Sequence, residues 1–269
     1  MKEITSLLEL KMSPQVFKLN SEIYGIQYGD PSEKKIVKKV LFTIDLSLEA
    51  IHYALKNKVN LIISFHGLIN NSIQNFNKIL INKLSLLVKY PISIFVLNST
   101  FIGAEGGISE TIMNALYLTL DKTFDITSKN GKRIPIGRIG VTQDYPYQKK
   151  SLTLEDLIKR IQSNLELEKI SYVGDLSVKI KKVCIIGCDN FLNIKDIEKA
   201  LKCECNCLIS SRFHHKDAIF AKEAGLCLIE ISLYKTKMLA MKKLCNILSL
   251  EFPYDEFLFF NSKDPFETY

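Results

Sequence analysis

The chain lacks any apolar run of the roughly 18 residues that a membrane-spanning helix requires, which argues against a helical membrane protein. It also lacks the uninterrupted apolar stretch of a signal peptide, because its first ten residues include Glu3 and Glu9. The same acids argue against a transit peptide, so we expect a cytosolic protein. Its 269 residues, 47% hydrophobic and 24% charged, suffice for a well-buried core in two modest domains or one large domain.

Cysteine is absent from the first 183 residues, and the seven cysteines that follow are an odd number. A secreted, disulfide-bonded domain more often has an even and distributed set. The spacing Cys203-x-Cys205-x-Cys207 suggests a metal site, but zinc sites typically have about two to four residues between paired cysteines. This segment also leads into an apolar stretch. We therefore expect buried, reduced thiols.

Common catalytic signatures are missing as well. The glycines at 103, 106 and 107 have neither the G-x-G-x-x-G spacing nor the Lys-Ser/Thr of a P-loop, so they predict a turn before a helix. No G-x-S-x-G elbow and no paired carboxylates are evident. Cys188 and Asp189 follow an expected strand, but nothing in the sequence places a base beside this thiol, so a Cys/His nucleophile pair lacks support.

The net charge of +7 leaves nucleic-acid binding open as an alternative. Lysine is spread along the whole chain, which favours a general compositional bias over a basic binding face. The densest cluster, Lys34-Lys35 with Lys38-Lys39, has no interleaved aromatic residues of the kind that stack on bases.

What the chain does contain is a repeated pattern of strand, helix and strand. Residues 40–66 and 183–212 have this pattern, and Asn60–Ser64 aligns with Asn206–Ser210. A repeated βαβ unit predicts an α/β fold of two similar lobes with mixed, largely parallel sheets. We expect a first lobe over residues 1–125 and a second over 126–269, with the C-terminal helix and tail as candidates to return to the first lobe. The polar segment 121–134 is a lobe junction or an exposed hairpin.

Ligands in such folds bind beyond the carboxyl ends of the strands. This rule directs attention to residues 64–66 and 210–212. Outside the repeat, the sequence predicts helices over residues 4–19, 74–88, 109–116, 154–165, 216–224 and 236–248, and strands over 24–30, 92–97, 134–141, 172–178 and 226–231. Ser47 and Gly225 are the expected N-cap of one helix and C-terminal glycine of another.

Short motifs follow one another in order along most of the chain. They are GIQYGD at 25–30, TID at 43–45, LIISFHGLI at 61–69, GGISE at 106–110, GRIG at 137–140, VGD at 173–175, and LIS at 208–210 followed by His214, His215 and Ala218. Their order and spacing resemble those of the Nif-three-like proteins, also named type-2 GTP cyclohydrolase I homologues. The resemblance implies two α/β lobes that hold two divalent metal ions between them.

The metal ligands implied by the resemblance are not matched here. The family has two adjacent histidines where this chain has Phe65 and His66. The family's H-T-x-x-D segment corresponds to residues 98–102, which places Ile102 at the carboxylate position. The late histidine and glutamate correspond to Leu233 and Lys237. His66 is thus the one family ligand position that is retained.

A dinuclear site needs several anionic or imidazole donors to offset the lost hydration of the ions. A lysine ammonium has donors only, and it repels a cation, most strongly where water is excluded. We therefore expect no metal cofactor and no catalytic residues. His66, Arg212, His214, His215 and Lys237 remain as candidates for a residual ligand-binding cleft, in which Arg212 and Lys237 would bind an anion. Hydrogen bonding and helix capping are the alternative roles for His214 and His215.

The favoured hypothesis is a non-catalytic scaffold or regulatory interaction protein. The resemblance implies a homo-oligomer, a trimer or a hexamer, with protein partners that include transcription-related ones. A metal-dependent hydrolase or cyclohydrolase acting on a nucleotide-like substrate is one alternative. A basic module that binds RNA or a ribonucleoprotein, with steeply salt-dependent affinity, is the other.

Overall fold

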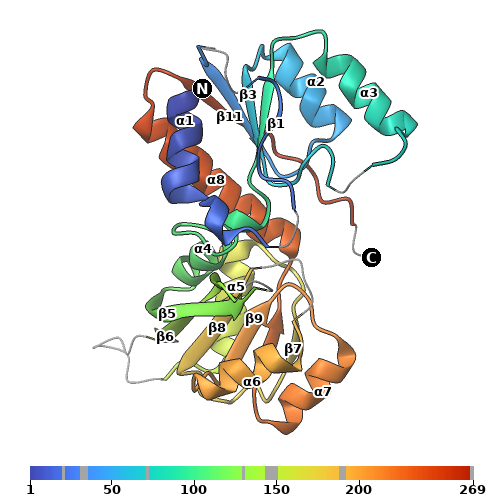
Figure 1. The fold of residues 1–269 in the computed structure, drawn as a ribbon. Helices are drawn as coiled ribbons and strands as arrows, with labels where there is room; N and C mark the ends of the chain where they lie inside the picture. The colour runs from blue at the N-terminus through green and yellow to red at the C-terminus, as the bar shows by residue number, and fades with distance from the viewer. Residues whose placement is uncertain are drawn as a thin grey trace. The chain divides into compact units, whose positions relative to one another are not determined.

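The computed structural model describes residues 1–19, 22–30, 36–70, 73–128, 131–142, 151–187 and 192–266. Two compact units make up the chain: residues 1–101 together with 240–269, and residues 102–239. Each unit has its own β-sheet with helices packed against it (Figure 1). The α/β class with mixed sheets, expected from the sequence, is therefore confirmed. Among the described residues, no helix combines the length and the hydropathy needed to cross a membrane.

The sheet of the first unit has the strand order β1-β4-β3-β2-β11. The strands are β1 (Gly25–Tyr28), β2 (Lys39–Thr43), β3 (Leu61–Ser64), β4 (Ser93–Val96) and β11 (Glu256–Phe259). β1 is antiparallel to β4, and the other neighbours are parallel. Helices α2 (Leu48–Lys56) and α3 (Lys78–Leu87) lie on one side of this sheet, and α1 (Lys2–Leu7) lies on the other (Figure 1).

The sheet of the second unit has the order β5-β6-β8-β9-β10-β7. Its strands are β5 (Leu118–Thr127), β6 (Arg133–Thr142), β7 (Ser171–Val173), β8 (Lys182–Ile186), β9 (Cys207–Ser210) and β10 (Cys227–Glu230). β8, β9 and β10 are parallel, whereas the β5–β6–β8 and β10–β7 pairs are antiparallel. The helices are α4 (Ile108–Ala115), α5 (Leu154–Leu165), α6 (Ile194–Lys202), α7 (His215–Glu223) and α8 (Leu233–Glu251).

The internal repeat is visible in the register of the parallel strands. In the first unit Val40 pairs with Leu61 and Thr43 with Ser64. In the second unit Val183 pairs with Cys207 and Ile186 with Ser210. The two βαβ units thus have the same register, as the alignment of Asn60–Ser64 with Asn206–Ser210 predicts.

Local sequence signals explain where several helices begin. The Ser47 hydroxyl accepts the backbone N–H of Ala50 at 3.0 Å, so the expected N-cap of α2 is confirmed. Thr153 and Asp156 form a reciprocal capping box at the start of α5. α7 ends before Gly225, whose φ of +73° is the left-handed conformation that glycine adopts most readily.

Some boundaries differ from those expected. The sequence predicts that the N-terminal helix breaks or restarts near Ser13 and Pro14, and a break is found there. The segment is in three short pieces: α1, a π-helical turn at Leu8–Met12 and a 3-10 turn at Gln15–Phe17. The strand predicted over 172–178 ends at Val173, because Gly174 has a φ of +125° and Asp175 accepts the N–H of Ser177 in a turn. Within the segment 121–134, residues 121–127 belong to β5 and residues 133–134 to β6, and the two strands are antiparallel, as the exposed-hairpin alternative predicts.

Two segments belong to a unit other than the one that contains most of their neighbours in the expected lobe. Residues 102–125, which the sequence analysis assigns to the first lobe, contribute α4 and most of β5 to the second unit. The C-terminal tail enters the first unit as β11, which pairs with β2. Helix α8 begins in the second unit and ends in the first.

Candidate functional site

In the first unit, the residues after β3 lie at the carboxyl edge of the parallel strands. The backbone N–H groups of Phe65 and His66 donate to the carbonyl oxygens of Thr43 and Ile44, which extends the sheet by two residues. The Phe65 side chain is only 1% exposed and lies within the core. The half-buried imidazole of His66 meets the Phe65 ring edge-on, with 4.8 Å between ring centroids.

The polar side chains of the segment after β4 form hydrogen bonds to the N-terminal part of the chain. Asn98 has a φ of +50° and begins a 3-10 turn, and its side-chain amide donates to the Ile23 carbonyl at 3.2 Å. The Ser99 hydroxyl accepts the N–H of Leu19 at 2.9 Å. Thr100 bonds to the Leu97 carbonyl and to the Ser13 hydroxyl. These buried side chains therefore anchor the N-terminal segment to the end of β4.

In the second unit, three of the predicted positions follow the ends of β4 and β10. Ile102 is 4% exposed and its carbonyl accepts the N–H of Ser109. Leu233 and Lys237 lie one turn apart at the start of α8. Leu233 is partly exposed, whereas Lys237 is only 3% exposed. An ammonium this deeply buried is an unusual feature that the sequence alone did not reveal.

The remaining candidates lie after β9. Arg212, His214 and His215 are all exposed, in contrast to Lys237. His214 occupies the N-cap position of α7, but its side chain makes no capping hydrogen bond to the helix. The loop is held by the Phe213 N–H, which donates to the Glu230 carboxylate at 3.2 Å. Arg212 and Lys237 thus have different solvent environments, and the anion pocket that would combine them remains a prediction.

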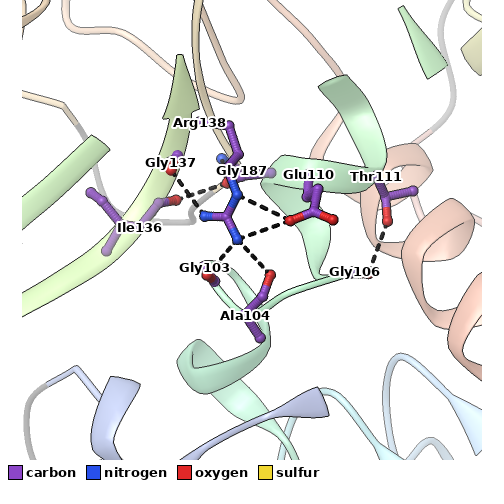
Figure 2. A network of polar contacts seen from close by, with 10 residues as sticks. Gly103, Ala104, Gly106, Glu110, Thr111, Ile136, Gly137, Arg138 and Gly187 are labelled. Atoms are coloured by element: carbon purple, nitrogen blue, oxygen red, sulfur yellow. Dashed lines mark hydrogen bonds and ion pairs between the residues drawn. The ribbon is translucent and has the colours of Figure 1, made fainter. Parts of the chain in front are cut away.

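Arg138 is the centre of a buried polar network that the sequence analysis did not identify as important (Figure 2). The residue is 4% exposed, and its guanidinium donates to the Gly103 and Ala104 carbonyls at 2.9 Å each. It also pairs with the Glu110 carboxylate at 3.1 Å. The arginine on β6 therefore fixes the loop that leads into α4.

Ser109 extends this network to a third element. Its hydroxyl donates to the Ile136 carbonyl at 2.7 Å and accepts the N–H of Gly187 at 3.0 Å. Gly103 lies so close to β6 that an added Cβ would be 1.4 Å from the Pro135 carbonyl oxygen. The signal for this network was present in the motifs GGISE and GRIG, which contain the opposite charges of Glu110 and Arg138.

One carboxylate of the second unit is buried without a hydrogen bond from any described residue. Asp217, on the first turn of α7, is fully buried, and neither of its oxygens has a hydrogen-bond partner among the described residues. Its neighbour Asp196 lies on the first turn of α6. Burial and the charge of Asp217 raise the pKa of the Asp196 carboxyl, while its hydrogen bond from the Asn193 N–H lowers it.

The described part of the chain contains no group of three or more His, Cys, Asp or Glu side chains arranged to hold a metal ion. The side chains at the positions implied by the resemblance, Phe65, Ile102, Leu233 and Lys237, offer no lone pair to a hard cation. These residues therefore do not fit a dinuclear metal cofactor. Cys188, Asp189 and the lysines at 34 and 35 lie outside the described residues.

Comparison with known proteins agrees with the architecture. A GTP cyclohydrolase 1 type 2 homolog of Methanocaldococcus jannaschii is 25% identical over 256 residues, covering 92% of this chain and 94% of that protein. A homolog of the same name from Clostridium perfringens is 25% identical and covers 98% of both. A crystal structure of a Bacillus cereus protein related to NIF3 superposes with a TM-score of 0.80 at 17% identity, covering 100% of this chain and 98% of that one.

A hypothetical protein of Staphylococcus aureus has the same fold, with a TM-score of 0.80 at 20% identity and coverage of 100% of this chain and 98% of that chain. The family model described as Duf34/NIF3 (NGG1p interacting factor 3) matches residues 1–265. This match spans both units and the return of the tail to the first sheet. The chain therefore belongs to the Duf34/NIF3 (NGG1p interacting factor 3) family.

Proposed function

We propose that this protein is a non-catalytic member of its family, which has lost the dinuclear metal site and acts as a scaffold or regulatory interaction protein. The single observation that carries the proposal is the burial of Lys237 at 3% exposure, at the position where the resemblance implies a glutamate ligand. A buried ammonium is costly unless its charge is compensated. Such a residue excludes a divalent cation from its surroundings, because the two charges repel in a medium of low dielectric constant.

The side chain of Phe65 supports the same proposal. The resemblance implies an imidazole ligand at this position, but the phenylalanine ring is 1% exposed and packs edge-on against His66. An aromatic ring in this place fills the core and supplies no ligand. His66 is then left without the adjacent histidine, and one imidazole does not hold two metal ions.

The polar segment after β4 points in the same direction. Asn98, Ser99 and Thr100 use their side chains to hold the N-terminal segment, as the hydrogen bonds to Ile23, Leu19 and Ser13 indicate. Ile102, at the implied carboxylate position, is 4% exposed. The residues that would build a catalytic centre therefore contribute to stability instead, while the fold itself is intact. A retained fold without its ligands favours a role in binding other macromolecules or in forming a homo-oligomer.

The metal content of the purified, tag-free protein tests this proposal. The protein should be prepared without chelators and analysed by elemental mass spectrometry, before and after incubation with zinc, iron or manganese salts. We expect no stoichiometric metal in either sample. The oligomeric state, measured by light scattering, should not change when EDTA is added.

An activity measurement separates this proposal from the metal-dependent alternative. Relatives carry the name GTP cyclohydrolase 1 type 2 homolog, so GTP is the first nucleotide to assay. We expect no turnover with or without added metal. Stoichiometric bound metal together with EDTA-sensitive GTP turnover would overturn the proposal and establish the enzyme hypothesis in its place.

A further inference from the structure

The second unit has a surface pocket that the proposed function does not use, here called the β7–α7 pocket. It lies where β7 and α7 end and β10 begins, and α7 packs against both strands (Figure 1). Its volume of about 650 Å³ is typical of a site for a small molecule. The implied metal positions Leu233 and Lys237 follow the carboxyl end of β10, so this pocket at the amino end of β10 is a separate feature.

The base of the β7–α7 pocket is apolar. Leu226 and Cys227 line it and are only 1% and 2% exposed, and the half-buried Val173 and Val178 line it beside them. Gly174 comes close to this base with a φ of +125°, and a Cβ added to it would be 2.7 Å from the Cys227 Sγ. The chain therefore covers one side of the pocket with bare backbone, and the base favours an apolar group over water.

An aromatic ring borders the same space. Tyr172 lines the pocket from β7, the last strand of its sheet, and is 43% exposed. Aromatic rings pair favourably in edge-to-face or offset arrangements, and a cysteine or methionine sulfur also makes favourable contacts with a ring. A ligand that carries a ring would thus find a partner in Tyr172 at the rim and a second one in the Cys227 sulfur at the base.

The pocket also has two opposite charges, one from each side. The Asp175 carboxylate accepts the N–H and the hydroxyl of Ser177 at 2.8 and 2.7 Å, both through Oδ1. These hydrogen bonds lower the pKa of Asp175, so its carboxylate is charged at neutral pH. The Oδ2 atom accepts no hydrogen bond from the described residues, and the exposed ammonium of Lys222, on α7, forms no ion pair with them. Both groups are therefore available to a ligand.

We propose that the β7–α7 pocket binds a free α-amino acid with a large aromatic side chain. The ammonium of the ligand binds Asp175, its carboxylate binds Lys222, and its ring lies on the apolar base. A zwitterion suits this pocket because each of its charges meets an opposite charge, whereas a simple anion or cation also meets a like charge. The flexible stem of Lys222 lets its ammonium adjust to the position of the ligand carboxylate. The proposal does not depend on the loss of the metal site.

L-Tryptophan is the probe that tests the proposal, because the chain has no tryptophan of its own. Its fluorescence anisotropy is followed during titration with the protein up to millimolar concentration, with excitation where tyrosine does not absorb. We expect saturable binding at one site per chain. Tryptamine lacks the carboxylate and indolepropionate lacks the ammonium, so each should bind about tenfold more weakly. The absence of L-tryptophan binding, or equally tight binding of either analogue, would overturn the proposal.

Variants locate the binding in this pocket. Lys222→Met and Asp175→Asn should each weaken L-tryptophan binding by about fivefold, because each removes one counter-charge at an exposed rim. Lys222→Met should not weaken tryptamine binding, since tryptamine has no carboxylate to lose. Lys216→Met and Glu223→Gln remove exposed charges elsewhere on α7 and should bind L-tryptophan as the wild type does.

Two results of the variant titrations contradict the assignment. Unchanged L-tryptophan binding in Lys222→Met and Asp175→Asn would place the ligand elsewhere on the protein. Equal weakening by the pocket variants and the two controls would show an effect of net charge alone. Circular dichroism verifies that each variant is folded, and Lys222→Met decides the question if Asp175→Asn is not, because the Lys222 side chain is exposed.

Discussion

Asn60 in the first unit and Asn206 in the second make the same pair of hydrogen bonds. The side-chain oxygen of Asn60 accepts the backbone N–H groups of Lys38 and Lys39 at 3.1 and 3.3 Å. The side-chain oxygen of Asn206 accepts those of Lys181 and Lys182 at 3.1 and 3.2 Å. The repeat is therefore preserved in the polar contact that joins its two strands, and not only in their order.

Replacing Asn206 with alanine should lower the free energy of unfolding by about 1 kcal/mol, because two backbone N–H groups lose their acceptor and one carbonyl loses its donor. Circular dichroism during urea denaturation measures this change, and it suits a chain without tryptophan. Asn60→Ala should have an effect of similar size. Asn82→Ala, at an exposed position within α3, is the control and should not lower the midpoint, because alanine favours a helix more than asparagine does. Equal effects of all three variants would contradict the structural role of the repeated asparagines.

Arg138→Met should destabilise the second unit by about 3 kcal/mol, because the change leaves the Glu110 carboxylate and two carbonyl groups without their buried partner. Arg138→Lys should restore only part of this loss, since a lysine cannot reach three acceptors in the same planar arrangement. Urea denaturation provides the measurement. Lys159→Met breaks an exposed ion pair with Glu155 and should have little effect. A stable Arg138→Met protein would show that the network in Figure 2 is dispensable.

Asp217→Asn should stabilise the protein, by about 1 kcal/mol or more, since a neutral group of the same shape replaces a fully buried carboxylate that has no hydrogen-bond partner among the described residues. Thermal and urea denaturation at neutral pH would detect the gain. Glu223→Gln, which removes an exposed charge from the same helix, is the matched control. Destabilisation by Asp217→Asn would mean that the carboxylate has a specific charged partner.

The stability of the protein should depend on the ionisation of Asp196. Burial, with the nearby charge of Asp217, raises the pKa of this carboxyl above 3.8 in the folded state, so the folded protein binds the proton more tightly than the unfolded chain does. Its contribution to stability is present below the ordinary aspartate pKa and is lost as pH rises through the folded-state pKa. As the pH rises from acidic to neutral, the unfolding free energy of the wild-type protein should therefore fall relative to that of Asp196→Asn. A difference that is independent of pH would contradict this assignment.

Much of the fold could be predicted from the sequence, because its signals are local. The repeat gave the βαβ units, Ser47 and Thr153 mark helix starts, and Gly225 marks a helix end. β5 was harder to identify, since only one of its faces is partly covered and its apolar residues do not alternate regularly. The aromatic sequence of β11 predicts that this segment is packed against other residues, but it does not identify β2 as its partner strand.

The environment of the candidate site residues could not be predicted from the sequence. The sequence identified Phe65, Ile102 and Lys237 by their positions in motifs, but burial depends on contacts between distant residues. The same holds for the buried carboxylate of Asp217, which has no hydrogen-bond partner among the described residues. Side-chain charge and spacing alone do not specify such contacts.

The division of the first sheet between two distant chain segments has a consequence for synthesis. The second unit is one continuous segment, residues 102–239, and can fold as soon as it leaves the ribosome. The first sheet cannot be completed until β11 has been made, because β11 supplies the strand beside β2. Until then the hydrogen-bonding edge of β2 is open to other chains, a known cause of aggregation. During synthesis, the first unit is therefore begun before the second unit but receives its last strand after it.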